Sequence, residues 1–261
     1  MPGTATISWI SSNFDADAQA FITNFNITNT TEKSALNTLV IAAKANGWWS
    51  LCNAIYPMVG SANSTCKGNL KDPRDLDAAF RLSFVNTPTF AATGVTFNGS
   101  TQYADTFLLP STTLSLNSSH ISLWSRTSAA STGISGNYDT ANSTVFVIYR
   151  RYTDNTFYAG VNQNPEESAI ANTDGSGFYM ASRTGANIVK YYKNATEYSK
   201  TTASTLLSGV KTLIGAGYNG ATIGQYDNFE CSFFTLGSGI SSAIAALMYT
   251  NIQSFQTALG R

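Results

Sequence analysis

Alternating apolar and polar residues dominate the chain after residue 80 and predict a series of β-strands. From 120 to 126, for example, Ile121 and Leu123 alternate with Trp124 and Arg126. Successive side chains of a strand point to opposite faces, so each strand has a core face and a second face. The predicted strands are 80–84, 95–97, 103–108, 114–116, 120–126, 143–152, 157–162, 178–183, 188–198 (a hairpin), 212–215 and 228–236. Short strands separated by Gly- and Asn-rich turns predict a mainly β fold, an antiparallel jelly-roll sandwich.

The second faces of three of these strands combine aromatic rings with arginines and predict a binding surface. The residues concerned are Trp124, Arg126, Tyr158, Tyr179 and Arg183. Sugar rings stack on Trp and Tyr, and Arg donates to hydroxyl groups, so this face favours a glycan as its ligand. The alternative is that the N-terminal helical segment or a second subunit simply covers these rings.

Helical spacing of apolar residues marks both ends of the chain. Residues 15–56 are helical in tendency, and a helix over 30–47 is indicated by apolar residues at helical spacing and by the stop at Asn46-Gly47. A second apolar stripe predicts a C-terminal helix over 241–259 that covers one flank of the sandwich. The expected organisation is an N-terminal arm (1–14), a helical appendage and joint (15–79), and a jelly roll (80–261) that includes the C-terminal helix (238–261).

The N-terminal arm is polar except for three large apolar side chains, Ile7, Trp9 and Ile10. We expect these three residues to anchor the domain to a partner, with an arm that folds back on the domain and a disordered arm as the alternatives. The first residues lack the basic start and apolar run of a secretory signal, so a non-secreted protein is expected. The most apolar window, 39–51, is too short to cross a bilayer, so no membrane insertion is expected.

Charge is scarce in this chain, and its balance excludes some partners. Charged residues make up 11% of the sequence, and 15 basic residues balance 15 acidic ones, so nucleic acid is not an expected partner. The densest group of charges lies in 69–81, where the signs alternate around Pro73. We interpret this cluster as a salt-bridged joint before the first strand, with a catalytic or metal-binding cluster as the alternative.

Motifs for catalysis or for a cofactor are few. The lone histidine, His120, lies in a predicted strand without a nucleophile motif nearby. The pattern G-x-G-x-x-G at 215–220 is followed by a predicted turn and strand, whereas a dinucleotide site needs a helix there. The glutamates, Glu32, Glu166, Glu167, Glu197 and Glu230, form no pair spaced for glycoside hydrolysis. We therefore expect a non-enzymatic protein.

The possible metal ligands and the cysteines give no indication of a bound metal. Asp139, Asp174 and Asp227 lie in turns that could offer oxygen ligands to Ca²⁺, but Asp is common in turns for its local hydrogen bonds, so no cofactor is expected. The three cysteines, Cys52, Cys66 and Cys231, match no zinc spacing. We expect them to be free, mostly buried thiols, with a pair between Cys52 and Cys66 left open.

Several segments resemble a known group of proteins. Segments 94–103, 191–195, 213–216 and 229–234 resemble concanavalin A-like, laminin-G-type jelly-roll domains, and segments 54–60, 69–81 and 255–261 resemble structural proteins of tailed bacteriophages. The resemblance implies a non-enzymatic, homo-oligomeric virion surface protein (capsid decoration, head fibre or tail component) that is assembled with other virion proteins in the host cytoplasm and contacts a host-surface glycan. The alternatives are a carbohydrate-binding adhesin and, less favoured, a glycoside hydrolase.

Overall fold

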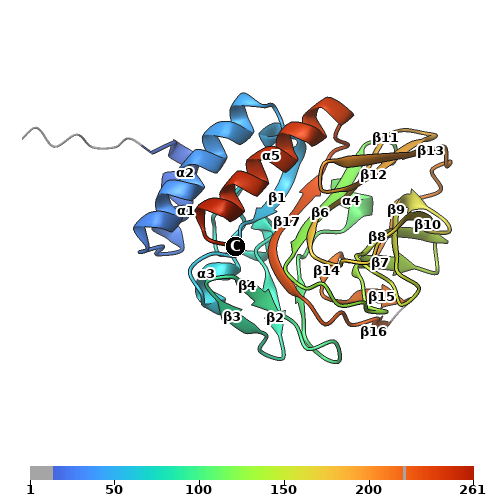
Figure 1. The fold of residues 1–261 in the computed structure, drawn as a ribbon, viewed down its shortest axis with the longest axis horizontal. Helices are drawn as coiled ribbons and strands as arrows, with labels where there is room; N and C mark the ends of the chain where they lie inside the picture. The colour runs from blue at the N-terminus through green and yellow to red at the C-terminus, as the bar shows by residue number, and fades with distance from the viewer. Residues whose placement is uncertain (1–13, 220–221) are drawn as a thin grey trace, which may run out of the picture.

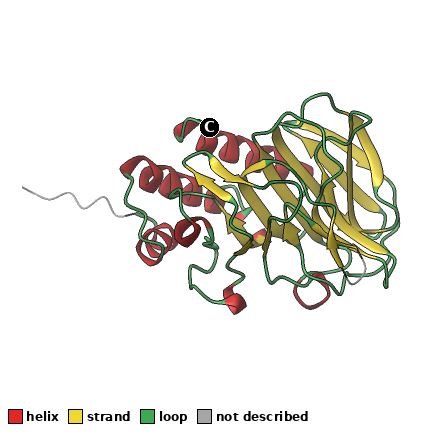
Figure 2. Ribbon diagram, turned by 90° about the horizontal axis from the view of Figure 1, so that it is seen from below, coloured by secondary structure: helices red, strands yellow, loops and turns green. Residues whose placement is uncertain are grey.

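Three layers make up the part of the chain that the computed structural model describes, residues 14–219 and 222–261: a layer of helices and two β-sheets (Figure 1). Figure 2 shows the long helices gathered on one side of the molecule and the strands stacked on the other. The predicted mainly β sandwich with helices at both ends is confirmed. The predicted arm residues Ile7, Trp9 and Ile10 lie outside the described residues.

The first sheet, sheet A, is the middle layer and has eight strands. They are β1 (Cys52–Tyr56), β3 (Thr89–Ala91), β4 (Gly94–Thr96), β6 (Ser119–Ser125), β11 (Gly177–Gly185), β12 (Ile188–Lys193), β13 (Thr196–Lys200) and β17 (Glu230–Gly237). Their order is β13-β12-β11-β6-β17-β4-β3, and β1 also pairs with β17. All these pairs are antiparallel.

The second sheet, sheet B, forms the outer layer and has nine strands. They are β2 (Ser83–Val85), β5 (Tyr103–Asp105), β7 (Ser135–Asp139), β8 (Thr144–Tyr149), β9 (Thr156–Gln163), β10 (Glu167–Ala171), β14 (Leu213–Ile214), β15 (Gly217–Asn219) and β16 (Thr222–Gly224). The main order is β10-β9-β8-β7-β14-β5-β2, with β15 pairing β16 and β7.

The helices begin where side chains can satisfy their free N–H groups. Asp15 caps α1 (Ala16–Asn24), and the Asn29 side chain accepts from the N–H groups of the second and third residues of α2 (Thr30–Ala45). The C-terminal helix α5 (Ser242–Ala258) agrees with the predicted stripe. The shorter helices are η1 (Trp49–Leu51), α3 (Asn63–Cys66), η2 (Asp77–Ala79) and α4 (Pro110–Thr113). None of the helices described is long and apolar enough to span a membrane.

Two hydrophobic cores lie on the two faces of sheet A. One fills the space between the sheets and includes Leu123 and Phe146. The other lies between sheet A and the helices, where Met180 and Phe233 pack with Leu39 of α2. Sheet A is therefore buried on both faces, so its strands carry apolar residues at successive positions rather than a strict alternation.

Some predicted elements were wrong. Residues 52–56 form strand β1 instead of helix, and 114–116 follow the short helix α4 and contain no strand. Glu167 begins strand β10, where a loop was expected. Ile55 and Tyr56 suit a strand, but they belong to the apolar cluster that follows α2, and this position hides the signal.

The charged segment 69–81 is salt-bridged, as predicted, but it follows strand β1 and does not precede the first strand. Arg81 pairs with Asp75 and Asp77 at 3.2 and 2.7 Å, and Lys67 pairs with Asp75 at 2.6 Å. The three cysteines are free and buried, as predicted, and burial raises the pKa of the Cys66 thiol to about 11.

Candidate ligand-binding site

The five side chains predicted to share a binding face lie on different faces in the structure. In the pairing of β6 with β11, Trp124 stands opposite Phe178, and Tyr179 stands opposite Leu123. Trp124 and Tyr179 therefore project from opposite faces of sheet A, because directly paired residues share a face. The aromatic and arginine face expected from the sequence is not formed.

Burial explains what these residues do instead. Tyr179 and Arg183 are fully buried between the sheets, and Trp124 lies parallel to Tyr249 of α5 with ring centroids 6.3 Å apart. The Arg183 guanidinium donates to the carbonyls of Val161, of Gly185 at the end of β11, and of two loop residues, 186 and 202. A buried charge whose donors are satisfied by several backbone carbonyls has a structural role and is not available to a ligand.

The remaining two predicted residues are separated as well. Arg126 lies 3.5 Å from the Glu230 carboxylate on sheet A. Tyr158 of β9 projects from the face of sheet B that is turned away from sheet A, where it packs in a third hydrophobic cluster. Of the predicted site residues, Tyr158 alone belongs to the site described next.

Four tyrosines gather on this outer face of sheet B, and three of them were missed in the sequence. Tyr138 lies on β7, Tyr149 ends β8 opposite Tyr158 of β9, and Tyr152 follows in the β8–β9 turn. They pack over Val145, Val147 and Ile134. The signal in the sequence was the unbroken apolar run of β8, since a strand whose outer face met only water would alternate with polar residues.

Three of the rings form a box. The ring pairs Tyr149–Tyr152, Tyr149–Tyr158 and Tyr152–Tyr158 have centroids 5.8, 6.4 and 5.8 Å apart and interplanar angles of 84°, 77° and 84°. Edge-to-face packing of this kind is a favourable arrangement of aromatic rings. It fixes the rings relative to one another without a ligand, so the box is preformed.

Two polar side chains complete the site, Glu166 from the β9–β10 loop and Gln225 after β16. Gln225 Nε2 donates to the Tyr149 hydroxyl at 3.0 Å. Glu166 Oε2 and Gln225 Oε1 are buried oxygens that have no hydrogen-bond partner in the part of the chain that is described. Buried polar atoms are usually paired, so these two acceptors are available to a ligand. We call Tyr138, Tyr149, Tyr152, Tyr158, Glu166 and Gln225 the tyrosine hollow.

The tyrosine hollow has two adjoining compartments of about 240 and 290 Å³. Tyr149, Tyr152, Glu166 and Gln225 line both, while Tyr158 closes one and Tyr138 the other. Such volumes lie just below the roughly 300–1,000 Å³ of pockets for drug-sized ligands. Each compartment therefore suits a single small ring or group.

Electrostatics keep two tyrosines of the hollow, Tyr138 and Tyr149, protonated. Burial, together with the Glu166 carboxylate, raises the pKa of both Tyr138 and Tyr149 above the ordinary value of 10.0. Each hydroxyl thus remains a neutral group that can donate or accept a hydrogen bond at neutral pH. No lysine or arginine is among the residues that line either compartment.

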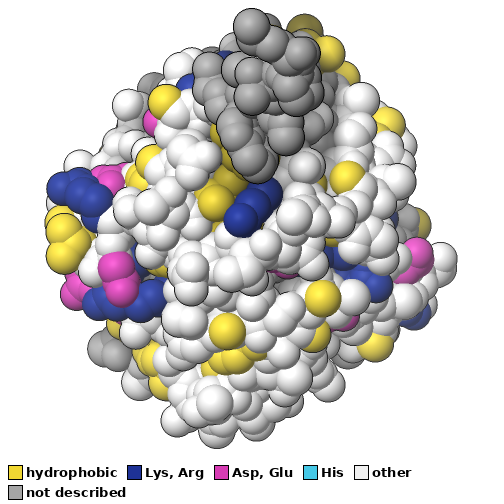
Figure 3. All heavy atoms as spheres, turned by 90° about the vertical axis from the view of Figure 1, so that its left-hand side faces the viewer, with side chains coloured by type: hydrophobic (Ala, Val, Ile, Leu, Met, Phe, Trp, Pro, Cys, Tyr) yellow, Lys and Arg dark blue, Asp and Glu magenta, His cyan; other side chains and the backbone are white. Residues whose placement is uncertain are grey.

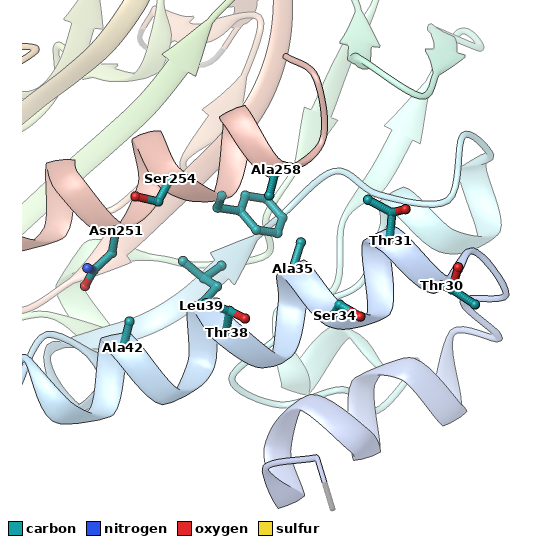
Figure 4. Close-up of a pocket in the computed structure, with 11 residues that line it drawn as sticks. Thr30, Thr31, Ser34, Ala35, Thr38, Leu39, Ala42, Asn251, Ser254 and Ala258 are labelled. Atoms are coloured by element: carbon teal, nitrogen blue, oxygen red, sulfur yellow. The ribbon is translucent and has the colours of Figure 1, made fainter. Parts of the chain in front are cut away.

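A larger hollow of about 530 Å³ lies between α2 and α5, and we call it the helix groove. Figure 4 shows Thr31, Ser34 and Thr38 of α2 across from Ser254 and Ala258 of α5. Phe255 is the one aromatic residue that lines it, and this side chain is only 3% exposed. The groove is lined by hydroxyl, amide and apolar side chains, and it lacks the exposed aromatic rings and the carboxylate that the tyrosine hollow offers.

The surface on the helical side of the molecule is also poor in charge. Figure 3 shows this face with few Lys, Arg, Asp and Glu side chains and with hydrophobic groups scattered in small patches. Single exposed apolar side chains are normal on protein surfaces. The tyrosine hollow is thus the better candidate site.

The other residues considered for chemistry have structural partners. His120 is buried, and its Nδ1 donates to the Ser238 carbonyl at 2.5 Å. Asp139 accepts from Asn142 and Gly209, and Asp227 pairs with Arg150 at 2.7 Å. Within residues 14–219 and 222–261, no three His, Cys, Asp or Glu side chains form a group that could hold a metal ion.

Comparison with known proteins gives structural likeness alone. Neither a protein-family profile nor a curated protein sequence matches this chain. A Trypanosoma rangeli sialidase is similar in structure with a TM-score of 0.50 and 8% identity, over 85% of this chain and 40% of the sialidase chain. At such low identity the likeness supports the fold alone, a β-sandwich.

Two further solved structures are more distant. Domain 4 of the extracellular GH43 arabinanase AbnA from Geobacillus stearothermophilus, solved with arabinotriose, has a TM-score of 0.48 and 15% identity over 76% of this chain and 98% of that chain. The CBM40 of the Ruminococcus gnavus IT-sialidase has a TM-score of 0.36 and 14% identity over 50% of this chain and 82% of that chain. None of these matches indicates a phage origin.

Proposed function

We propose that this protein is a non-catalytic carbohydrate-binding module that holds one sugar ring in the tyrosine hollow. The observation that carries the proposal is the preformed box of tyrosine rings with two buried, unpartnered acceptor oxygens, on Glu166 and Gln225. A sugar presents C–H faces to aromatic rings and hydroxyl donors to such acceptors. Both kinds of contact lie within one small hollow on the outer face of sheet B.

The absence of catalysis is proposed from the carboxylates around this site. Hydrolysis of a glycosidic bond normally uses two carboxyl groups on opposite sides of the scissile bond. Glu166 is the one carboxylate among the described side chains that line the hollow. A further carboxylate, Asp154, accepts from the Tyr158 hydroxyl at 2.7 Å and from the Thr156 N–H. We therefore propose binding without turnover.

The virion role predicted from the sequence stays a prediction, because the comparisons give it no support. A glycan-binding module is compatible with a receptor-binding protein on a particle and equally with an adhesin. The tyrosine hollow is the part of the molecule that both roles share.

The test is a glycan-array screen of the wild-type protein and of a Tyr152→Ala/Tyr158→Ala variant. We expect the wild type to bind a defined set of glycans and the variant to lose at least about tenfold in affinity, since each ring contact contributes on the order of 1 kcal/mol. Tyr198→Ala is the matched control, because Tyr198 is a partly buried tyrosine on sheet A. Equal loss in both variants, or no glycan binding by the wild type, would overturn the proposal.

A further inference from the structure

We infer that the tyrosine hollow selects glycans that carry a positively charged ammonium group, and that this group is held between the ring box and Glu166. The inference rests on the proposed carbohydrate binding and adds the charge of the ligand to it. Two features carry it: the mutual orientation of the rings and the sign of the charges around them.

Ring orientation distinguishes a box from a flat platform. A sugar ring stacks on one aromatic face, and the nearly perpendicular arrangement of Tyr149, Tyr152 and Tyr158 leaves the other ring faces for a substituent of that sugar. Three perpendicular rings surround a compact group from several sides. Aromatic boxes of this form recognise ammonium groups, because the negative face of each ring attracts a cation.

Every polar group available to a ligand in the hollow is an acceptor or is neutral. Among the residues that line the hollow, Glu166 Oε2 and Gln225 Oε1 are buried oxygens without a partner in the described chain, and the Tyr138 and Tyr149 hydroxyls stay protonated. An ammonium group carries only donors, so it complements these oxygens, whereas a neutral hydroxyl leaves the carboxylate charge uncompensated.

No lysine or arginine of the described chain lines either compartment. The basic residue adjacent in sequence, Arg151, donates to Asn155 Oδ1 and to the Ser128 carbonyl and does not line the hollow. The Asp154 carboxylate on the Tyr158 hydroxyl adds negative charge behind one wall of the box. With zero net charge on the whole chain, the attraction for a cation is local to this site.

The ammonium group could belong to an unacetylated amino sugar or to a choline substituent on a glycan. Both present an alkylammonium of suitable size for a compartment of about 240 Å³. Isothermal titration calorimetry with glucosamine oligomers, N-acetylglucosamine oligomers and glucose oligomers of equal length, in slightly acidic buffer, tests the charge. Competition with choline chloride then distinguishes the two sources.

We expect the affinity for glucosamine oligomers to be at least about tenfold higher than that for the two neutral sets. This difference corresponds to the free energy of one cation–π contact with a desolvated ammonium group. Glu166→Gln keeps the size of the side chain and should abolish this preference. Glu230→Gln, the control, removes a carboxylate that pairs with Arg126 on sheet A and should leave the preference unchanged.

The outcomes separate the two proposals. One outcome is that the wild type binds charged and neutral oligomers equally and that Tyr152→Ala/Tyr158→Ala binds neither. This result would overturn the ammonium inference and leave the proposed carbohydrate binding intact. A preference that persists in Glu166→Gln, or that disappears equally in Glu230→Gln, would overturn it too. Failure of every oligomer and of every glycan on the array to bind would overturn the proposed function itself.

Discussion

Asp227→Asn is a sharp test of what holds the tyrosine hollow in place. The Asp227 carboxylate accepts two hydrogen bonds from Arg150, from Nε at 2.9 Å and from Nη2 at 2.7 Å. Arg150 directly follows β8, and Asp227 lies two residues after Gln225. The pair therefore ties the segment that carries Gln225 to the strand that carries Tyr149.

The expected loss in the free energy of unfolding follows from the burial of this ion pair. Both side chains are 1% exposed, and Arg150 Nη1 already donates to Ser125, Thr127 and Gly175. Asparagine keeps the shape of Asp227 but removes its charge, so the guanidinium charge remains buried and uncompensated. Breaking a buried ion pair in this way costs about 3–5 kcal/mol, a large part of the roughly 5–15 kcal/mol that stabilises a typical protein.

Urea denaturation measures this loss. With an m-value of about 3 kcal/mol/M, the unfolding midpoint should fall by about 1 M or more. Asp77→Asn, which removes one partner of the solvent-exposed pair with Arg81, is the control and should cost less than about 1 kcal/mol. Replacing both buried charges with Arg150→Met/Asp227→Leu should recover part of the loss. Equal midpoints for Asp227→Asn and Asp77→Asn would refute the reasoning.

Two further predictions concern residues that the sequence left ambiguous. Burial lowers the pKa of His120 from 6.5 to about 4, so the unfolded state takes up a proton at a higher pH than the folded state does. The free energy of unfolding should therefore fall by up to about 3 kcal/mol as the pH drops from about 6.5 to 4, as measured by urea titrations at several pH values. His120→Gln should lack this part of the pH dependence. Trp124→Ala should lower the free energy of unfolding by about 3 kcal/mol, because it removes the ring that packs on Tyr249 of α5, and should leave glycan affinity unchanged. If Trp124→Ala instead lost glycan binding with unchanged stability, the result would support the aromatic binding face predicted from the sequence.

The helices and most strands could be read from the sequence because their periodicity is local. Leu36, Leu39, Val40 and Ala43 recur along one side of α2, and all four are buried. The same kind of stripe marks α5, where Met248, Ile252 and Phe255 are buried. Such patterns depend on the geometry of one element, so no tertiary information is needed.

The binding face could not be read correctly because it depends on register. Alternation fixes which residues of one strand share a face, but the relation between two strands is set by their pairing. The pairing of Trp124 with Phe178 puts Tyr179 inside the sandwich. Because sheet A is buried on both faces, neither face of β6 or β11 is plainly polar, so the sequence holds no cue to choose between them.

The tyrosine hollow was missed for a related reason. Its members come from β7, β8, the β8–β9 turn, β9, the loop before β10 and the segment after β16. Gln225 and Glu166 meet only because β15 pairs with β7 and brings the following segment over the sheet. In the sequence each tyrosine looks like an ordinary strand or turn residue.

The most direct test of carbohydrate binding in the tyrosine hollow is an NMR titration of protein labelled with ¹³C at its tyrosine rings. Glucosamine oligomers are the first ligand. The account predicts saturable shifts of the resonances of Tyr138, Tyr149, Tyr152 and Tyr158, with those of Tyr198 unchanged. Saturable binding that leaves the four hollow tyrosines unshifted would contradict it.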